Sequence, residues 1–322
     1  MANFDVFNGD ADGLCALHQL RLAEPRDSVL ITGVKRDIDL LRKVHASAGD
    51  HITVLDVSLD KNRGALQKLL EQGSQVTYVD HHFAGDIPDH PALNAIIDPS
   101  PGVCTSSLVD ELLQGHFRIW AVVAAFGDNS PGCATRLAAS LGLSGDDLDK
   151  LSELGACLNY NAYGNTVDDL FFHPAELYRH LHAYPDPFDF MTAEAVFPVL
   201  KRGYTADMAM AKAEQPAWVY AGGAVYILPD QSWSRRVSGA FGNYLAQAEP
   251  ALAHAVLTRK PAGGYGVSVR APRARPTGAD ELCYRFETGG GRKSAAGINE
   301  LPENDLSRFL DRFGAAFDIS HR

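Results

Sequence analysis

Three adjacent side chains that could bind a metal ion follow a run of residues typical of a β-strand. Residues 76–79 are β-branched or aromatic, and Asp80, His81 and His82 come directly after them, before a loop rich in Gly, Asp and Pro. Such residues favour strands, and open α/β sheets carry their chemistry at the carboxyl ends of the strands. Neighbouring strand residues point to opposite faces, so these side chains converge only if the strand ends here. For this triplet alone, a solvated surface cluster is the alternative.

Further aspartates stand at the ends of other predicted elements. Asp10 and Asp12 lie between a strand-like run and a helical stripe, Asp56 lies near the end of another strand-like run, and Asp128 follows a buried apolar run. Each has a structural alternative, since an aspartate in such a turn can cap a helix. Capping needs one carboxylate, however, and the first turn carries two. The joint placement of five aspartates therefore favours a shared site over separate structural roles.

A glycine-rich segment near the carboxyl end of the sequence suits a phosphate group. It contains three glycines followed by two cations: Gly289, Gly290, Gly291, Arg292 and Lys293. We expect a loop over residues 289–297 whose backbone N–H groups cradle a phosphate. A flexible linker is the alternative, but linkers do not carry Arg-Lys-Ser-Ala-Ala-Gly within a domain.

The elements that must position these residues alternate between strands and helices. Strands are predicted over residues 4–7, 29–34, 52–57, 76–79 and 95–99, and helices over 14–23, 38–44, 60–70 and 105–113. This rhythm favours a parallel sheet covered by helices. Residues 137–184 are predicted to be helical with an interruption at 159–165, interpreted as a structural loop, with a segment that lines a cleft as the alternative. Pro185 and Pro187 break that pattern, which predicts a first domain over residues 1–185, a helical connector over 186–215 and a second domain over 216–322.

Composition narrows the class of protein. The 322 residues are 46% hydrophobic, enough for a sizeable core and more than the usual single domain. The five cysteines are scattered without a C-x-x-C pair, which favours reduced thiols. No signal-peptide pattern or membrane-length apolar run is found, so we expect a cytoplasmic protein without a membrane partner.

Charge is distributed unevenly along the chain. Residues 1–215 hold 16 Lys and Arg against 30 Asp and Glu, a net charge of −14, whereas residues 216–322 carry a net charge of +3. The acidic part suits divalent cations, and the basic part suits a phosphate-bearing substrate. The total of −11 argues against a protein that coats long nucleic acid by electrostatics alone.

In these motifs the chain resembles the DHH phosphoesterase superfamily, in the subgroup that carries a C-terminal DHHA1 domain. Residues 8–13 are similar to its first motif, Asp56 to the second, Asp80-His81-His82 to the third and Asp128 to the fourth. Two further segments, residues 268–270 and 289–297, are similar to the substrate-binding signatures of DHHA1. The resemblance covers nearly the whole chain. It implies an α/β fold with an N-terminal parallel-sheet DHH domain, flanking helices, a smaller α/β DHHA1 domain and an active site in the cleft between them.

The sequence departs from the family pattern at two positions. Several branches carry a histidine four residues before the first motif aspartate, where this chain has Val6, so its first motif is closer to that of the single-strand exonuclease branch. Relatives usually read Gly-Gly-Gly-His where this chain has Arg292. Arginine keeps the phosphate-clamping role with a bidentate fork, but it cannot shuttle protons at neutral pH.

The resemblance implies a phosphodiesterase with two divalent ions, Mn²⁺ preferred, held by oxygen and imidazole ligands. The expected metal ligands are six residues: Asp10, Asp12, Asp56, Asp80, His81 and Asp128. His82 is expected to be either a ligand or a phosphate contact and general acid, and Arg292 to stabilise charge on the reacting phosphate. The substrate-binding residues are expected to be Ser268, Arg270, Gly289, Gly290, Gly291, Arg292 and Lys293.

The expected substrate is a short nucleotide: a linear dinucleotide such as pGpG or pApA, or a very short oligoribonucleotide, as in the nanoRNase-like members of this subgroup. Long duplex nucleic acid is not expected to bind. Alternatives within the class are a cyclic dinucleotide phosphodiesterase and a 3′-phosphoadenosine phosphatase, followed by a single-strand exonuclease or an exopolyphosphatase. A non-catalytic nucleotide sensor is the alternative from another class. Base preference, cleavage polarity and whether the chain forms a homodimer stay open.

Overall fold

The computed structural model describes residues 1–318 and divides into two compact units, Met1–Arg202 and Gly203–Arg322. The division falls within helix α9 (Val196–Ala213). The division into a first domain over residues 1–185, a connector over 186–215 and a second domain over 216–322, with a separate function for each part, stays a prediction. None of the helices in the described part of the chain is long and apolar enough to cross a membrane.

The first unit is built on a parallel sheet with the strand order β2-β1-β3-β4-β5. Its strands are β1 (Asn3–Phe7), β2 (Val29–Ile31), β3 (His51–Leu55), β4 (Gln75–Asp80) and β5 (Leu93–Ile97). Every neighbouring pair in this sheet is parallel. The order of the strands reverses at β1 and β3, and open α/β sheets bind their ligands in the crevice beyond the carboxyl ends of the strands at such a point.

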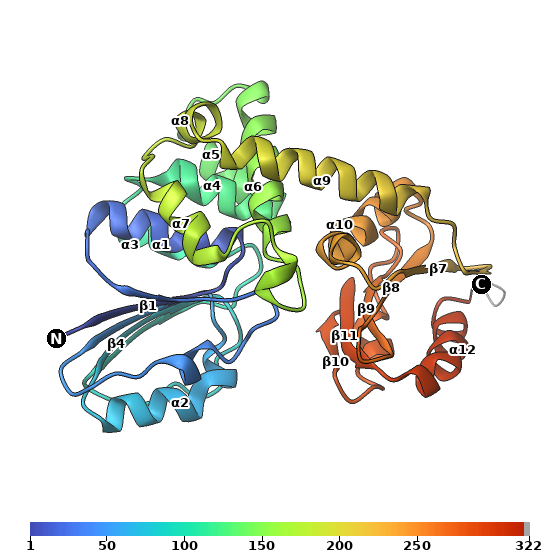
Figure 1. Cartoon of the computed structure of the whole chain (residues 1–322), viewed down its shortest axis with the longest axis horizontal. Helices are drawn as coiled ribbons and strands as arrows, with labels where there is room; N and C mark the ends of the chain where they lie inside the picture. The colour runs from blue at the N-terminus through green and yellow to red at the C-terminus, as the bar shows by residue number, and fades with distance from the viewer. Residues whose placement is uncertain (319–322) are drawn as a thin grey trace. The chain divides into compact units, whose positions relative to one another are not determined.

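Helices cover both faces of this sheet. Those of the first unit are α1 (Ala11–Ala23), η1 (Leu40–Lys43), α2 (Leu59–Glu71), α3 (Thr105–Leu112), α4 (Arg118–Gly127), α5 (Pro131–Ala138), α6 (Gly145–Asn161), η2 (Val167–Asp169), α7 (Pro174–His182) and α8 (Pro187–Ala193). Figure 1 shows α2 on one face of the sheet and α1 on the other. The prediction of parallel strands wrapped by helices is therefore confirmed.

One predicted helix, over residues 38–44, is wrong. The structure has only a short 3₁₀ segment there, Leu40–Lys43. The side chain of Asn62 accepts the N–H of Leu41 at 3.2 Å and donates to the carbonyl of Ile38 at 2.7 Å. Side-chain bonds thus satisfy backbone groups of this segment locally, in place of the bonds of an α-helix.

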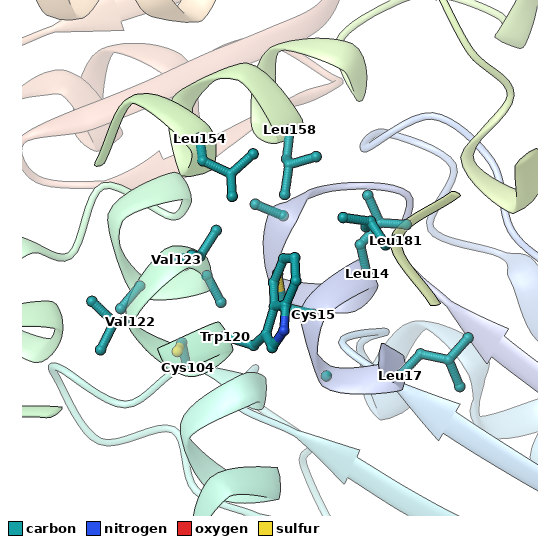
Figure 2. Packing of buried hydrophobic residues seen from close by; sticks show 14 of the residues in the cluster. Leu14, Cys15, Leu17, Cys104, Trp120, Val122, Val123, Leu154, Leu158 and Leu181 are labelled. Atoms are coloured by element: carbon teal, nitrogen blue, oxygen red, sulfur yellow. The ribbon is translucent and has the colours of Figure 1, made fainter. Parts of the chain in front are cut away.

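Alternate residues of the central strands enter two different cores. Phe7, Leu55 and Val79 pack with α1, α3, α4 and α6, whereas their predecessors Val6, Val54 and Tyr78 pack with α2 and η1. Because strand side chains alternate between faces, a sheet covered on both sides needs apolar residues at consecutive positions. Figure 2 shows the first core around Trp120 of α4, with Leu14 and Cys15 of α1 and Leu154 and Leu158 of α6 in the same cluster.

The second unit is a mixed sheet with the order β10-β11-β9-β8-β7-β6. Its strands are β6 (Trp218–Tyr220), β7 (Gly223–Leu228), β8 (Ala253–Arg259), β9 (Tyr265–Arg270), β10 (Gly289–Arg292) and β11 (Ala295–Leu301). Its other elements are α10 (Ser232–Ala248), α11 (Ala279–Cys283), η3 (Glu303–Asp305) and α12 (Leu306–Ala316). Helix α10 connects the parallel pair β7 and β8, and the remaining pairs are antiparallel.

Candidate active site

The turn between β1 and α1 holds two carboxylates with different partners. Oδ1 of Asp10 caps α1 by accepting the N–H groups of Asp12 and Gly13 at 3.0 and 3.1 Å. Asp12 instead accepts the N–H groups of Thr105 and Ser106, both at 2.7 Å, at the start of α3. The two aspartates therefore tie two helix N-termini to the end of β1, where partial positive charge favours carboxylates.

Gly9 allows the chain after β2 to reach this turn. A Cβ on Gly9 would lie 2.1 Å from the carbonyl oxygen of Gly33 and 2.7 Å from Cγ of Pro174. Only a residue without a side chain permits that approach. The segment after β2 thereby lies against the turn that carries Asp10.

Asp56 follows β3 in a conformation that is unusual for a residue with a side chain. Its φ is +58°, in the left-handed region. Its Oδ1 accepts the Thr105 hydroxyl at 3.1 Å, and its N–H donates to the carbonyl of Val79 at 3.1 Å. Residues held in this region cost about 1–3 kcal/mol and cluster at functional sites. The strain is therefore consistent with a functional position for this carboxylate.

The residues at the end of β4 and directly after it lie close to Asp12 and Asp56. His82 Nδ1 lies 2.7 Å from Oδ1 of Asp80, and His81 Nε2 lies 3.4 Å from Asp56 Oδ1 and 3.9 Å from Asp12 Oδ2. The other nitrogen of His81, Nδ1, lies 3.0 Å from the carbonyl of Val103. A carbonyl only accepts, so Nδ1 carries a proton and the lone pair of the neutral ring lies on Nε2, towards the carboxylates. Metal-binding histidines are oriented in this way.

These residues fit a divalent cation. Ligand atoms of Asp56, His81 and His82 lie within 4.8 Å of one another. Asp80 is fully buried, and its Oδ2 is one of the buried side-chain atoms without a hydrogen-bond partner in the described part of the chain. Burial raises the pKa of Asp56 well above its ordinary value, and the charges of Asp10 and Asp12 raise it further. Clustered, desolvated carboxylates of this kind are stabilised by a bound cation.

Asp128 lies on the other side of Asp10, with a lysine between them. The Nζ atom of Lys35 is 2.5 Å from Asp10 Oδ2, 3.4 Å from Asp128 Oδ1 and 3.3 Å from Asn159 Oδ1. Burial acts to raise the pKa of Asp10, but the charge and hydrogen bond of Lys35 outweigh it and lower this pKa to about 2. All six predicted metal ligands thus gather around the carboxyl end of one sheet, and their roles as ligands stay predictions.

Lys35 and Asn159 are not among the predicted site residues, although the alternative to a structural loop at residues 159–165 is a segment that lines a cleft. The interpretation of 159–165 as a loop is wrong for Asn159, which lies within α6. Lys35 follows the predicted strand 29–34 directly, the same signal that marks the aspartates. A search by ligand type does not find it, because an ammonium group cannot coordinate a metal ion.

In the second unit, the two predicted substrate-binding segments lie on neighbouring strands. Ser268 of β9 pairs with Gly297 of β11, and Arg270 pairs with Ala295. The Arg270 guanidinium donates to Asn243 Oδ1 at 2.6 Å and to the Ser268 hydroxyl at 2.9 Å. These bonds hold the arginine in a fixed orientation.

The prediction of a loop over residues 289–297 is wrong. The segment is a β-hairpin at the edge of the sheet, with Arg292 and Lys293 exposed at its tip. Its glycines have packing roles, since a Cβ on Gly289 would lie 1.8 Å from the carbonyl oxygen of Cys283, and Gly291 has a φ of +140°. The hairpin still presents both cations to solvent. The meeting of this hairpin and the carboxylate cluster in one active site stays a prediction.

Comparison with known proteins relates the chain to solved structures of low sequence identity. No protein-family model and no curated protein sequence matches it. A manganese-bound exonuclease RecJ is similar over 98% of this chain and 89% of its own, with 18% identity and a TM-score of 0.63. The Mn²⁺ complex of RecJ from Thermus thermophilus gives 19% identity and a TM-score of 0.64, and the chain spans about half of it, 51%.

A third structure is similar over nearly the full length of both proteins. The pGpG-specific phosphodiesterase PggH from Vibrio cholerae is 16% identical, with a TM-score of 0.58 over 98% of this chain and 99% of its own. These likenesses agree with the α/β architecture. The chain therefore has the fold of RecJ and PggH.

Proposed function

We propose that this protein is a metal-dependent phosphodiesterase, Mn²⁺ preferred, that hydrolyses linear dinucleotides or very short oligoribonucleotides to mononucleotides. The observation that carries the proposal is the cluster at the carboxyl end of the sheet, where His81 Nε2 faces the Asp12 and Asp56 carboxylates and Asp80 Oδ2 is buried without a hydrogen-bond partner. A bound divalent ion supplies Lewis-acid activation of water and of the phosphodiester. A nucleotide sensor would have no need for such a desolvated, strained arrangement.

The protein's own side chains have three tasks in this proposal. Asp12, Asp56, Asp80 and His81 hold the metal, and the backbone N–H groups at the start of α3 fix the orientation of Asp12. His82, which is 45% exposed at its side chain and bonded to Asp80, reaches the substrate phosphate or donates a proton to the leaving group. Arg292 binds a substrate phosphate, with a charge that persists at every physiological pH.

Charge supports a short substrate. The acidic residues 1–215 repel the phosphates of a longer strand, and the exposed Arg292 and Lys293 form only a small basic feature. Exposed charges are screened beyond about 8–10 Å at physiological salt, so the repulsion is modest. The full-length likeness to PggH supports the same substrate class. The likeness to RecJ favours a single-strand exonuclease as the second candidate.

A substrate series separates the candidates. The test measures kcat/KM with Mn²⁺ for 5′-phosphorylated oligoribonucleotides of increasing length, for cyclic dinucleotides and for 3′-phosphoadenosine 5′-phosphate, at two salt concentrations. We expect the rate to be highest for dinucleotides, to fall with length less steeply at high salt, and to vanish on chelation. Cyclic dinucleotides lack a terminus and should be poor substrates. A rate that climbs steadily with length would favour the exonuclease, and no metal-dependent turnover would refute the proposal.

A further inference from the structure

The ammonium group of Lys35 occupies a cation position in the carboxylate cluster. An ammonium has three N–H donors, and three oxygens surround this one: Asp10 Oδ2, Asp128 Oδ1 and Asn159 Oδ1, at 2.5, 3.4 and 3.3 Å. The Tyr163 ring adds a weaker contact, with its centroid 5.8 Å from Nζ. Every donor of the lysine therefore has a partner of suitable charge or dipole.

The backbone holds the lysine in this position. The Lys35 N–H donates to the carbonyl of Ala162 at 2.8 Å, just past the end of α6. On the other side, the close approach of Gly33 to Gly9 fixes the chain against the β1–α1 turn. Lys35 is thus attached at two points to the elements that carry its partners, and its side chain is only 25% exposed.

This placement conflicts with a second divalent ion between Asp10 and Asp128. Hard divalent cations bind carboxylate oxygens at about 2.0–2.6 Å, and Nζ already lies 2.5 Å from Asp10 Oδ2. The other oxygen of Asp10 accepts two backbone N–H groups. An ion on Asp10 would also meet the positive charge of Lys35 at close range in a partly buried site, where such repulsion is stronger than in water.

We propose that Lys35 replaces the second divalent ion of this site as a built-in cation, so that each chain holds one tightly bound ion, coordinated by Asp12, Asp56, Asp80 and His81. The inference rests on the proposed function, and it changes the metal content expected from the family resemblance. One divalent ion and one ammonium group together bring three positive charges to the five aspartates, whereas two divalent ions would bring four. Asp10 and Asp128 then position the lysine and do not coordinate metal.

The test counts bound Mn²⁺ per chain by equilibrium dialysis with elemental analysis, and examines the bound ions by electron paramagnetic resonance. We expect one tightly bound ion in the wild type, without the coupled signal of a manganese pair. Lys35→Met keeps the length of the side chain and removes its charge, so it should bind two ions and show that signal. Lys43→Met is the matched control: Lys43 pairs with Asp37 outside the cluster, and its removal should leave one ion bound.

The outcomes separate this inference from the proposed function. Two tightly bound ions in the wild type would refute the role of Lys35 and leave the phosphodiesterase proposal standing. One ion in both the wild type and Lys35→Met would also refute it, with circular dichroism verifying that the variant is folded. If the wild type binds no divalent ion, the proposed function itself fails and the inference fails with it.

Discussion

The contact of Gly9 with the chain after β2 gives a sharp prediction for Gly9→Ala. The new Cβ would lie 2.1 Å from the Gly33 carbonyl oxygen and 2.7 Å from Pro174 Cγ. Reaching an ordinary contact distance of about 3.5 Å requires a shift of more than about 1 Å. Overpacking of this kind costs about 1–3 kcal/mol of unfolding free energy, which lowers the melting temperature of a unit this size by about 2–12 °C.

The same shift should impair activity more than stability. It separates Asp10 from the segment that carries Lys35, and a misplacement of about 1 Å at a reacting centre can cost about 100-fold in rate. Thermal unfolding and Mn²⁺-dependent dinucleotide hydrolysis measure the two effects.

Gly64→Ala is the control for both measurements. Gly64 lies inside α2, and a Cβ there would meet nothing within 4 Å. Alanine should stabilise this helix by about 0.5–1 kcal/mol and leave turnover unchanged. If Gly9→Ala unfolds at or above the wild-type temperature and retains full activity, the close approach at the β1–α1 turn is not what positions this site.

The described contacts lead to three further predictions. Asp80→Ala should abolish Mn²⁺-dependent turnover and weaken the thermal stabilisation that Mn²⁺ provides; near wild-type rates would contradict the metal assignment. Arg292→Ala should raise KM and lower kcat together, because a phosphate contact also acts in the transition state, and Arg292→Lys should restore activity only in part because it loses the bidentate fork; a fully active alanine variant would remove Arg292 from the site. Burial lowers the pKa of His18 to about 3, so the folded state excludes a proton that the unfolded chain binds below about pH 6.5. This effect should remove about 2 kcal/mol of stability between pH 6.5 and 5, and a His18→Gln variant, measured by chemical denaturation, should lack this part of the slope.

Sequence pattern was sufficient for the sheet and for the carboxylates around it. Strand-like runs that end in aspartate have a local cause, because β-propensity and the polar residue that ends each run are both visible in the chain. The apolar pairs Val6–Phe7, Val54–Leu55 and Tyr78–Val79 likewise indicate strands buried on both faces. The motif residues Asp10, Asp12, Asp56, Asp80 and Asp128 therefore point to a common site before any contact is known.

Local pattern was misleading where tertiary contacts satisfy the backbone. Residues 38–44 have a helical apolar spacing, yet Asn62 bonds to their backbone and only a 3₁₀ segment forms. The glycines of residues 289–297 suggest a phosphate-binding loop, yet pairing with β11 and close packing on Cys283 make the segment a hairpin. In both segments the pattern of the residues themselves does not identify the partner that decides the conformation.

The order of the strands and the position of Lys35 came only from packing. Sequence gives the succession of β1, β2 and β3, but their lateral order places β1 between β2 and β3, which brings Lys35, Asp10 and Asp56 to adjacent strand ends. Asp128 and Asn159 reach the same point because α4 and α6 pack against α1 through contacts that a Cβ on Gly127 would block, at 2.4 Å from Ala11 Cβ. The chain's residue types thus specify a cluster of carboxylates. Which cation each carboxylate faces depends on segments more than 20 residues apart that meet only in the folded protein.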